Sequence, residues 1–115
     1  MPSMIMRFTI NSNMAAGIRK FATDPKYSGP YRAMLGPDHL NVSKQAWYIS
    51  SFEDYLVIYF EGPSTVLQTF AQSVAAGDPV ANKCNATMQA GVSAPDFSLT
   101  SIPPGYTQVF SYSAP

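Results

Sequence analysis

The side chains that could do chemistry in this chain are few and widely spaced. His39 is the only histidine, and Cys84 is the only cysteine. An imidazole can act as a general base near neutral pH, but no orienting partner lies beside His39 in the sequence. His39 is therefore either a catalytic base or a loop residue that hydrogen-bonds to the backbone. A single cysteine excludes an internal disulfide and a multi-thiolate metal site, so we interpret Cys84 as a packing residue.

Four other residues are candidates for contact with a substrate. Tyr27 and Tyr31 lie in a segment broken by prolines and glycines, and loops on a rigid scaffold often carry function. Asn13 could polarise a bound carbonyl group, although helix capping also explains it. Trp47 lies in a predicted strand, where it would either line a cavity or pack in the core or at a subunit interface. For each of the four, ordinary packing is the alternative.

The composition limits the class of protein. The 115 residues are 46% hydrophobic and only 12% charged, with a formal net charge of zero. This length is typical of one domain, and we expect residues 1–115 to form it. The basic residues are scattered, which argues against a nucleic-acid partner. No apolar stretch is long enough to cross a membrane, and we predict neither a metal nor a cofactor.

The cellular compartment can also be inferred. Residues 1–10 lack the basic leader and long apolar core of a secretion signal. Together with the single cysteine, this predicts a reducing, cytoplasmic environment.

The strongest structural signal is a predicted β-hairpin. Two runs rich in aromatic and β-branched residues, Ala46 to Phe52 and Tyr55 to Glu61, flank the charged pair Glu53 and Asp54. In the second run, alternate residues on both faces of the strand are apolar or aromatic until Glu61. A strand of this kind needs cover on both faces of its sheet.

Before the hairpin, we expect a strand, a helix and a broken connection. Met4 to Ile10 alternates as a strand with one apolar face. Residues Asn11 to Asn13 offer caps for a helix that ends before Asp24-Pro25. The next segment predicts a long crossover with one short helical piece, Tyr31 to Leu35, closed by a left-handed Gly36.

After the hairpin, two helical segments and a strand are predicted. Apolar residues recur at helical spacing from Val66 to Val74, and Gly77 should end this helix. Asp78-Pro79 starts a second helical segment, which Gly91 closes. Phe97 to Ile102 is predicted as the last strand.

This order of elements predicts an α+β fold, the ferredoxin-like βαββαβ sandwich. Its four-stranded antiparallel sheet would have the first and third strands in the centre and the helices on one face. The bare face would pack against a second copy of the chain, which predicts a homodimer through the sheet face. Residues 106–115 would form a C-terminal arm across the joint. Arg7, if it faces this joint, would pair with Glu61 or a similar acid.

One stretch also carries a resemblance. The run AWYISSFEDYLVIYFEGPSTVLQTFAQS, with the DPVANK and GVSAPDF segments that follow it, resembles small uncharacterised bacterial proteins of the dimeric α+β barrel superfamily. It spans roughly Gln45 to Phe97 and is specific for the fold rather than for an activity. The chain differs from the group in two places: the turn at Glu53 lacks the usual glycine, and prolines interrupt the segment after the first helix.

The resemblance implies a range of activities. The superfamily includes cofactor-independent monooxygenases, haem-degrading monooxygenases, sugar mutarotases and muconolactone isomerase-like enzymes, with the site between the sheet and its helices. A haem site is disfavoured because residues 64–90 contain no histidine that could ligate the iron. A mutarotase is disfavoured because the chain has one histidine and few carboxylates for moving protons.

Two hypotheses from different classes remain. The first is a cofactor-independent, monooxygenase-like or isomerase-like dimer that binds an apolar or aromatic small molecule. The second is a non-catalytic dimeric structural or binding module whose cavity is filled by its own side chains. A deep pocket where His39, Tyr27, Tyr31 and Asn13 converge would favour the first, and a collapsed interior would favour the second. The sequence leaves open whether the protein is an enzyme.

Overall fold

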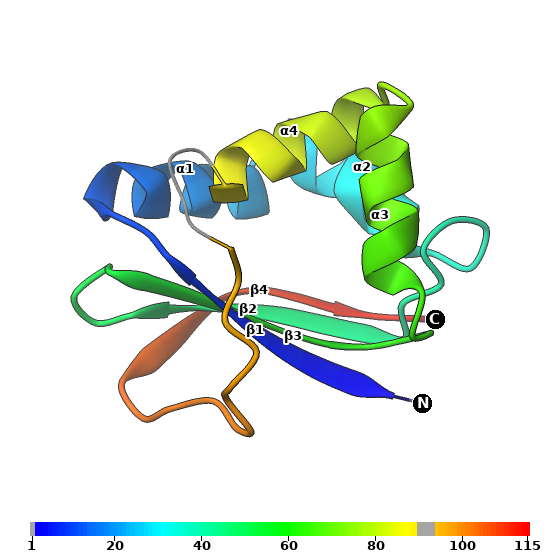
Figure 1. The fold of residues 1–115 in the computed structure, drawn as a ribbon. Helices are drawn as coiled ribbons and strands as arrows, with labels where there is room; N and C mark the ends of the chain where they lie inside the picture. Colours follow the sequence, from blue (N-terminus) through cyan, green and yellow to red (C-terminus); the bar gives the residue numbers. More distant parts are fainter. Residues whose placement is uncertain (1, 90–93) are drawn as a thin grey trace.

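The computed structural model of the chain describes residues 2–89 and 94–115, in which a four-stranded antiparallel sheet carries four helices on one face (Figure 1). This confirms the predicted α+β class. The strands are β1 (Ser3–Thr9), β2 (Lys44–Ser50), β3 (Tyr55–Glu61) and β4 (Tyr106–Ser113). The helices are α1 (Ser12–Thr23), α2 (Pro25–Leu35), α3 (Val66–Ala75) and α4 (Pro79–Gln89).

The order of the strands in the sheet is β1-β3-β2-β4. The expectation that β1 would be central is therefore wrong, and β2 takes that position beside β3. The reason is that β4 pairs with β2, where Trp47 lies opposite Phe110, instead of with β1. On the free edge of β1, Arg7 and Asp96 exchange two backbone hydrogen bonds of 2.8 Å. This bridge is one residue long, so β1 is an edge strand.

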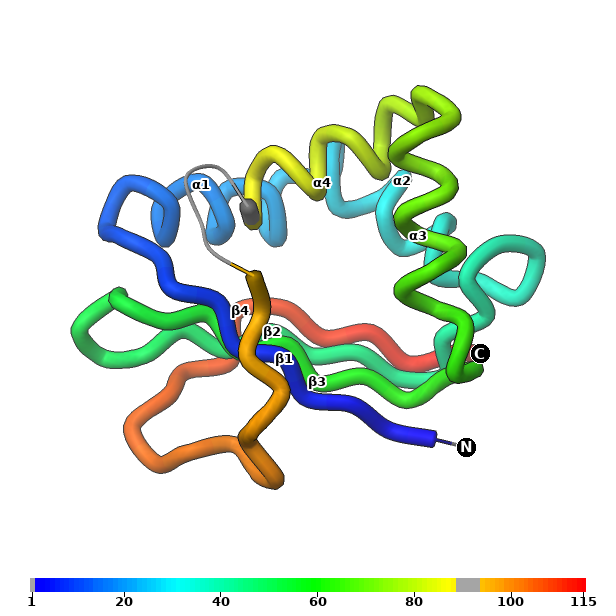
Figure 2. Tube along the Cα trace, in the orientation of Figure 1, coloured from blue at the N-terminus to red at the C-terminus, as the bar shows by residue number. Residues whose placement is uncertain are grey.

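The predicted strand at Phe97 to Ile102 is not formed. The Asp96 carboxylate accepts a hydrogen bond of 2.8 Å from the backbone N–H of Ser98, and this local turn leads the chain away from β1. The chain then passes to the side of the sheet opposite the helices before it enters β4 (Figure 2). The expected C-terminal arm, residues 106–115, is also corrected, because Tyr106–Ser113 is a strand of the chain's own sheet.

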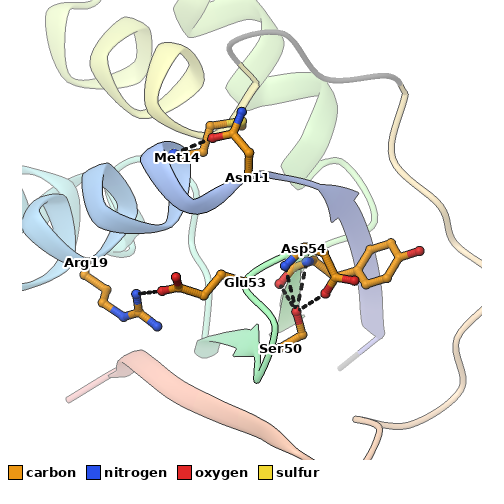
Figure 3. Close-up of polar contacts among 7 residues, drawn as sticks. Asn11, Met14, Arg19, Ser50, Glu53 and Asp54 are labelled. Carbon is orange, nitrogen blue, oxygen red and sulfur yellow. Dashed lines mark hydrogen bonds and ion pairs between the residues drawn. The ribbon is translucent and has the colours of Figure 1, made fainter.

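Helix α1 begins and ends where the sequence predicted. The Asn11 side chain accepts a hydrogen bond of 2.9 Å from the backbone N–H of Met14, which caps the helix (Figure 3). At its other end, the Asp24 side chain accepts a hydrogen bond from Lys26 and caps α2 directly, with Pro25 in the first turn.

Helix α2 replaces the predicted broken crossover. It continues through Pro30, whose ring removes one backbone hydrogen bond and costs about 3 kcal/mol in a helix interior. The helix survives because Tyr31, Met34 and Leu35 are buried in the core directly after the proline. Gly36 has φ −68°, so the predicted left-handed conformation is wrong.

The end of α3 and the start of α4 follow the predicted signals. Gly77 has φ +85°, a conformation that favours glycine, and it ends the last turn after α3. The Asp78 carboxylate accepts hydrogen bonds of 2.9 Å and 3.0 Å from the backbone N–H groups of Val80 and Ala81. The predicted close at Gly91 lies outside the described residues.

The turn between β2 and β3 is built around Ser50 (Figure 3). Its hydroxyl donates to the Asp54 carboxylate at 2.6 Å and accepts from the backbone N–H groups of Asp54 and Tyr55 at 3.1 Å and 3.0 Å. Glu53 takes the left-handed conformation (φ 58°) that glycine would ordinarily supply. Its carboxylate pairs with Arg19 of α1, which ties the turn to the helix layer.

The core between sheet and helices is aromatic at one end. Trp47 is fully buried there, with ring centroids of Phe110, Tyr31 and Phe21 at 4.6, 5.4 and 5.8 Å. Such pairs contribute about 0.5–1.5 kcal/mol each beyond the area they bury. This cluster fixes α1 and α2 against β2 and β4.

The opposite face of the sheet has no helix over it (Figure 1). In register across it lie Ile5, Tyr59 and Ala46 in one row, and Arg7, Val57 and Tyr48 in the next. The tyrosines and Ile5 are half-buried, whereas Val57 is fully buried between them.

Arg7 lies on this same face. Its guanidinium is 2.7 Å from the Asp96 carboxylate and 4.7 Å from the centroid of the Tyr55 ring. The acid that pairs with Arg7 is therefore Asp96, and Glu61 instead accepts a hydrogen bond from Tyr59.

Candidate functional site

A partly open cavity of about 120 Å³ lies between the sheet and the helices; we call it the inner cavity. Most of its lining is apolar and comes from β1, β3, α3 and α4, including Phe8, Ile58, Val66 and Phe70. Alternation along the strands explains this lining, because Met6 and Phe8 of β1 and Ile58 and Phe60 of β3 all point toward the helices.

One corner of the inner cavity is polar. The Gln45 side-chain oxygen accepts two hydrogen bonds, from the Tyr31 hydroxyl at 2.6 Å and from the Trp47 indole N–H at 3.1 Å. Gln45 is only 6% exposed, although it sits in a strand whose other helix-facing residues, Trp47 and Ile49, are apolar. Strand β2 presents it to the cavity, and α2 holds it from the other side through Tyr31.

This hydrogen-bond pattern fixes the orientation of the Gln45 amide. An indole nitrogen can only donate, so the amide atom that faces Trp47 must be the oxygen. The nitrogen then points elsewhere, and it makes no hydrogen bond with the described residues. Within the same part of the chain, every fully buried side-chain nitrogen or oxygen has a partner. The Gln45 nitrogen is therefore not fully buried, and Gln45 is one of the residues that line the inner cavity.

The titratable groups of the inner cavity, Tyr31 and Cys84, stay protonated at neutral pH. Burial raises the pKa of Tyr31 well above its usual value, and the nearby Cys84 raises it further. Burial also raises the pKa of Cys84 to about 12, against a smaller lowering effect of its hydrogen bond with Tyr31. A neutral thiol is a poor nucleophile and a neutral phenol is a poor base. The corner therefore offers hydrogen-bond donors rather than an acid–base pair.

The structure does not bring the sequence-predicted site residues together. Tyr31 lines the inner cavity, and Trp47 lies behind it and holds Gln45. Asn13 and Tyr27 line a different hollow, on the surface where α1, α2 and α4 meet. His39 is exposed in the turn after α2 and lines none of the three hollows described for residues 2–89 and 94–115. A catalytic role for His39 stays a prediction.

Gln45 is the residue that sequence reasoning missed. The signal that could have found it is a polar side chain two positions before Trp47, on the face of the strand that the tryptophan shares. A polar group on an otherwise apolar strand face must find hydrogen-bond partners in the core, and it often marks a site.

Among the residues described, no group of three or more histidine, cysteine, aspartate or glutamate side chains is placed to hold a metal ion. Within the same residues, no helix has both the length and the apolar character needed to cross a membrane.

Comparison with known proteins gives no match, whether with protein-family models, with curated proteins or with solved structures.

Proposed function

We propose that the inner cavity binds a small, mainly apolar molecule that carries one hydrogen-bond acceptor. The observation that supports this is the hydrogen bonding of the Gln45 amide. Its oxygen accepts from Tyr31 and Trp47, whereas its nitrogen makes no hydrogen bond with the described residues and can donate to a ligand. A ligand carbonyl or hydroxyl would accept a hydrogen bond from this nitrogen, which would contribute about 0.5–1.5 kcal/mol to binding.

The volume of the inner cavity limits the size of the ligand. An apolar cavity of about 150 Å³ accepts a benzene molecule. At about 120 Å³ the inner cavity has room for a molecule of that order, with any larger part extending through the open side. A single six-membered ring with one oxygen fits this description, whereas a fused polycyclic substrate does not fit inside.

The chemistry of the lining favours binding over proton transfer. The titratable side chains that line the cavity are Tyr31 and Cys84, both neutral at physiological pH. We therefore place a binding function first. The resemblance to the dimeric α+β barrel superfamily extends the proposal to a cofactor-independent, monooxygenase-like enzyme, in which the cavity would position the substrate.

We also propose that the chain is a homodimer of the ferredoxin-like, dimeric α+β barrel type. Support comes from the helix-free face of the sheet, where Tyr48, Tyr59 and Ile5 are half-buried around Val57. The single free thiol of Cys84 agrees with a reducing, cytoplasmic compartment.

The ligand proposal can be tested with cyclohexanone, which carries an acceptor, and methylcyclohexane, which does not. Trp47 is the only tryptophan and its indole N–H contacts Gln45, so its fluorescence and its indole N–H resonance report directly on the inner cavity. We expect saturable shifts with cyclohexanone and weaker ones with methylcyclohexane.

A matched pair of variants on α3 completes the test. Val66→Leu adds one methylene group to the cavity wall, whereas Val74→Leu adds it on the same helix away from the cavity. Cyclohexanone binding should be lost in the first and kept in the second. Absence of binding to the unaltered protein, or equal binding by both variants, would favour the alternative of a non-catalytic module with a filled cavity.

The dimer is tested separately by sedimentation of the unaltered protein and of Tyr59→Arg. We expect two chains per particle, and a monomer in the variant, because a buried unpaired charge opposes association. A monomeric unaltered protein would overturn the dimer and leave the ligand proposal untouched.

A further inference from the structure

A second hollow, which we call the outer groove, lies on the surface where α1, α2 and α4 meet. Its main part has a volume of about 310 Å³, and an adjoining part of about 270 Å³ shares Phe21, Tyr27 and Lys83 with it. This groove does not overlap the inner cavity in any lining residue.

The cations of the outer groove are lysines that make no ion pair with another described residue. The chain has four lysines, and three of them, Lys20, Lys26 and Lys83, line the groove and its adjoining part. The ion pairs between described residues involve Arg7 and Arg19 instead. No aspartate or glutamate lines either part of the groove. The result is a local excess of positive charge on a chain with no net charge.

The two aspartates at the neighbouring helix ends, Asp24 and Asp78, are not among the residues that line the groove. The Asp24 carboxylate accepts from Lys26 N–H at the start of α2, and the Asp78 carboxylate accepts from two N–H groups at the start of α4. Both carboxylates are engaged as caps, where they stabilise their own helices.

The wall between the lysines is apolar and aromatic. The rings of Phe21 and Tyr27 stack with centroids 6.0 Å apart and an angle of 13° between their planes. The Lys83 and Lys26 ammonium groups lie 5.0 Å and 5.7 Å from the centroid of the Tyr27 ring. Met14 adds an apolar side chain to the same surface.

Gly17 leaves the groove open on the α1 side. A Cβ atom added at Gly17 would meet nothing within 4 Å, so the missing side chain corresponds to free space. Gly17 is inside α1, where glycine costs about 1 kcal/mol relative to alanine.

From this combination we propose that the outer groove binds a small organic carboxylate with an apolar body. The carboxylate would lie between Lys20 and Lys83, and the body would cover Met14 and Phe21 in the space above Gly17. This site is separate from the inner cavity and does not depend on the function proposed for it.

Three probes test the proposal: benzoate, its neutral isostere benzamide, and acetate, which has the charge without the ring. Titration followed through the backbone amide resonances of Gly17 and Thr87 separates this site from the inner cavity, which Trp47 reports. We expect benzoate to bind most tightly, with an affinity that falls as salt is added, because exposed charges are screened. Equal binding of benzoate and benzamide would overturn the proposal, as would no saturation below roughly 10 mM.

Lysine variants identify the cations. Lys83→Gln should weaken benzoate about two- to fivefold, and Lys20→Gln with Lys83→Gln about tenfold, the scale of exposed ion pairs. Lys44→Gln removes the fourth lysine, which lies on β2 outside the groove, and should leave the affinity unchanged. A Lys44→Gln variant that weakens binding as much as the groove variants would show nonspecific attraction and overturn the site.

Gly17→Leu provides the steric test. It places a side chain in the free space of the groove and replaces a poor helix former with a good one, so the fold should become more stable. Benzoate binding should be lost while thermal stability rises. Unchanged benzoate affinity in this well-folded variant would contradict the proposed position of the ligand.

Discussion

The inner cavity and the outer groove take lining residues from the same two helices, α2 and α4. Helix α2 gives Tyr31 to the cavity and Tyr27 to the groove, and α4 gives Cys84 to the cavity and Lys83 to the groove. Phe21 of α1 separates the two hollows, since its ring contacts Tyr27, Tyr31 and Trp47.

The two hollows differ in the exposure of their polar groups, because Tyr31 and Gln45 of the inner cavity are buried whereas Lys20 and Lys83 of the outer groove are exposed. In the cavity, the Tyr31 hydroxyl donates to the Gln45 side-chain oxygen, and the titratable side chains are neutral. In the groove, the lysine ammonium groups stay solvated and charged, because long basic side chains keep their heads in water. Adjacent residues of one helix can thus supply a hydrogen-bonding site for a neutral ligand and a charged site for an anion.

The largest change in stability is expected from truncating Phe21, the side chain that separates the two hollows. Phe21→Ala should lower the free energy of unfolding by about 3–5 kcal/mol, because it deletes a buried ring that contacts three aromatic neighbours. Urea unfolding measures this cost. Phe52→Ala is the control, since Phe52 is 87% exposed in the β2–β3 turn and should change stability by less than about 0.5 kcal/mol. Equal costs for the two variants would contradict the position of Phe21.

The second largest loss of stability is expected from replacing Gln45 in the polar corner of the inner cavity. Gln45→Leu removes the acceptor of two buried donors and should cost about 2–4 kcal/mol in urea unfolding. Asn13→Ala removes an amide from the outer groove, where Asn13 is exposed, and should cost less than about 0.5 kcal/mol. If Gln45→Leu were as mild as Asn13→Ala, the distinction between a buried amide oxygen that accepts two hydrogen bonds and an exposed amide would fail.

Alkaline pH should destabilise the folded chain through the buried thiol of the inner cavity. The pKa of Cys84 is about 12 in the folded chain against an ordinary value of 9.0, so the unfolded chain loses this proton first. The contribution of the neutral Cys84 thiol to the free energy of unfolding is therefore fully present below pH 9. It should be lost as the pH rises toward 12, by about 1.4 kcal/mol per pH unit.

Urea unfolding at several pH values, with Cys84→Ala for comparison, checks this slope. The variant should show a shallower decline, which persists in part because the pKa of Tyr31 is also raised by burial. The same decline in both proteins would mean that the thiol is not buried as described.

The smallest effects come from the two tyrosine hydroxyls. Tyr31→Phe removes a buried donor to Gln45 but leaves the Trp47 bond, which should cost about 1 kcal/mol. Tyr27→Phe should leave stability unchanged, because no hydrogen bond joins the Tyr27 hydroxyl to the described residues, and Tyr27 is half-buried at the groove. The melting temperatures of the two variants measure these costs. A larger fall in melting temperature for Tyr27→Phe than for Tyr31→Phe would contradict the placement of Tyr31 in the inner cavity and Tyr27 at the outer groove.

The sequence by itself determined the local elements. Alternating apolar residues located β1, β2 and β3, and short polar caps located both ends of α1 and the start of α4. These features depend on neighbours within a few positions along the chain, so a pattern of residues is sufficient to predict them.

Only the tertiary structure decided which strand lies beside β1 and which residues share a site. Strand β4 pairs with β2 because the turn at Asp96 and Ser98 leads the chain off β1, and a local sequence pattern does not reveal where it goes next. Helix α2 persists through Pro30 because burial outweighs the cost of the proline. Gln45 contacts Tyr31, and Lys20 and Lys83 line one groove, only through the packing of α1, α2 and α4 on the sheet, since burial and shared lining are properties of the assembled fold.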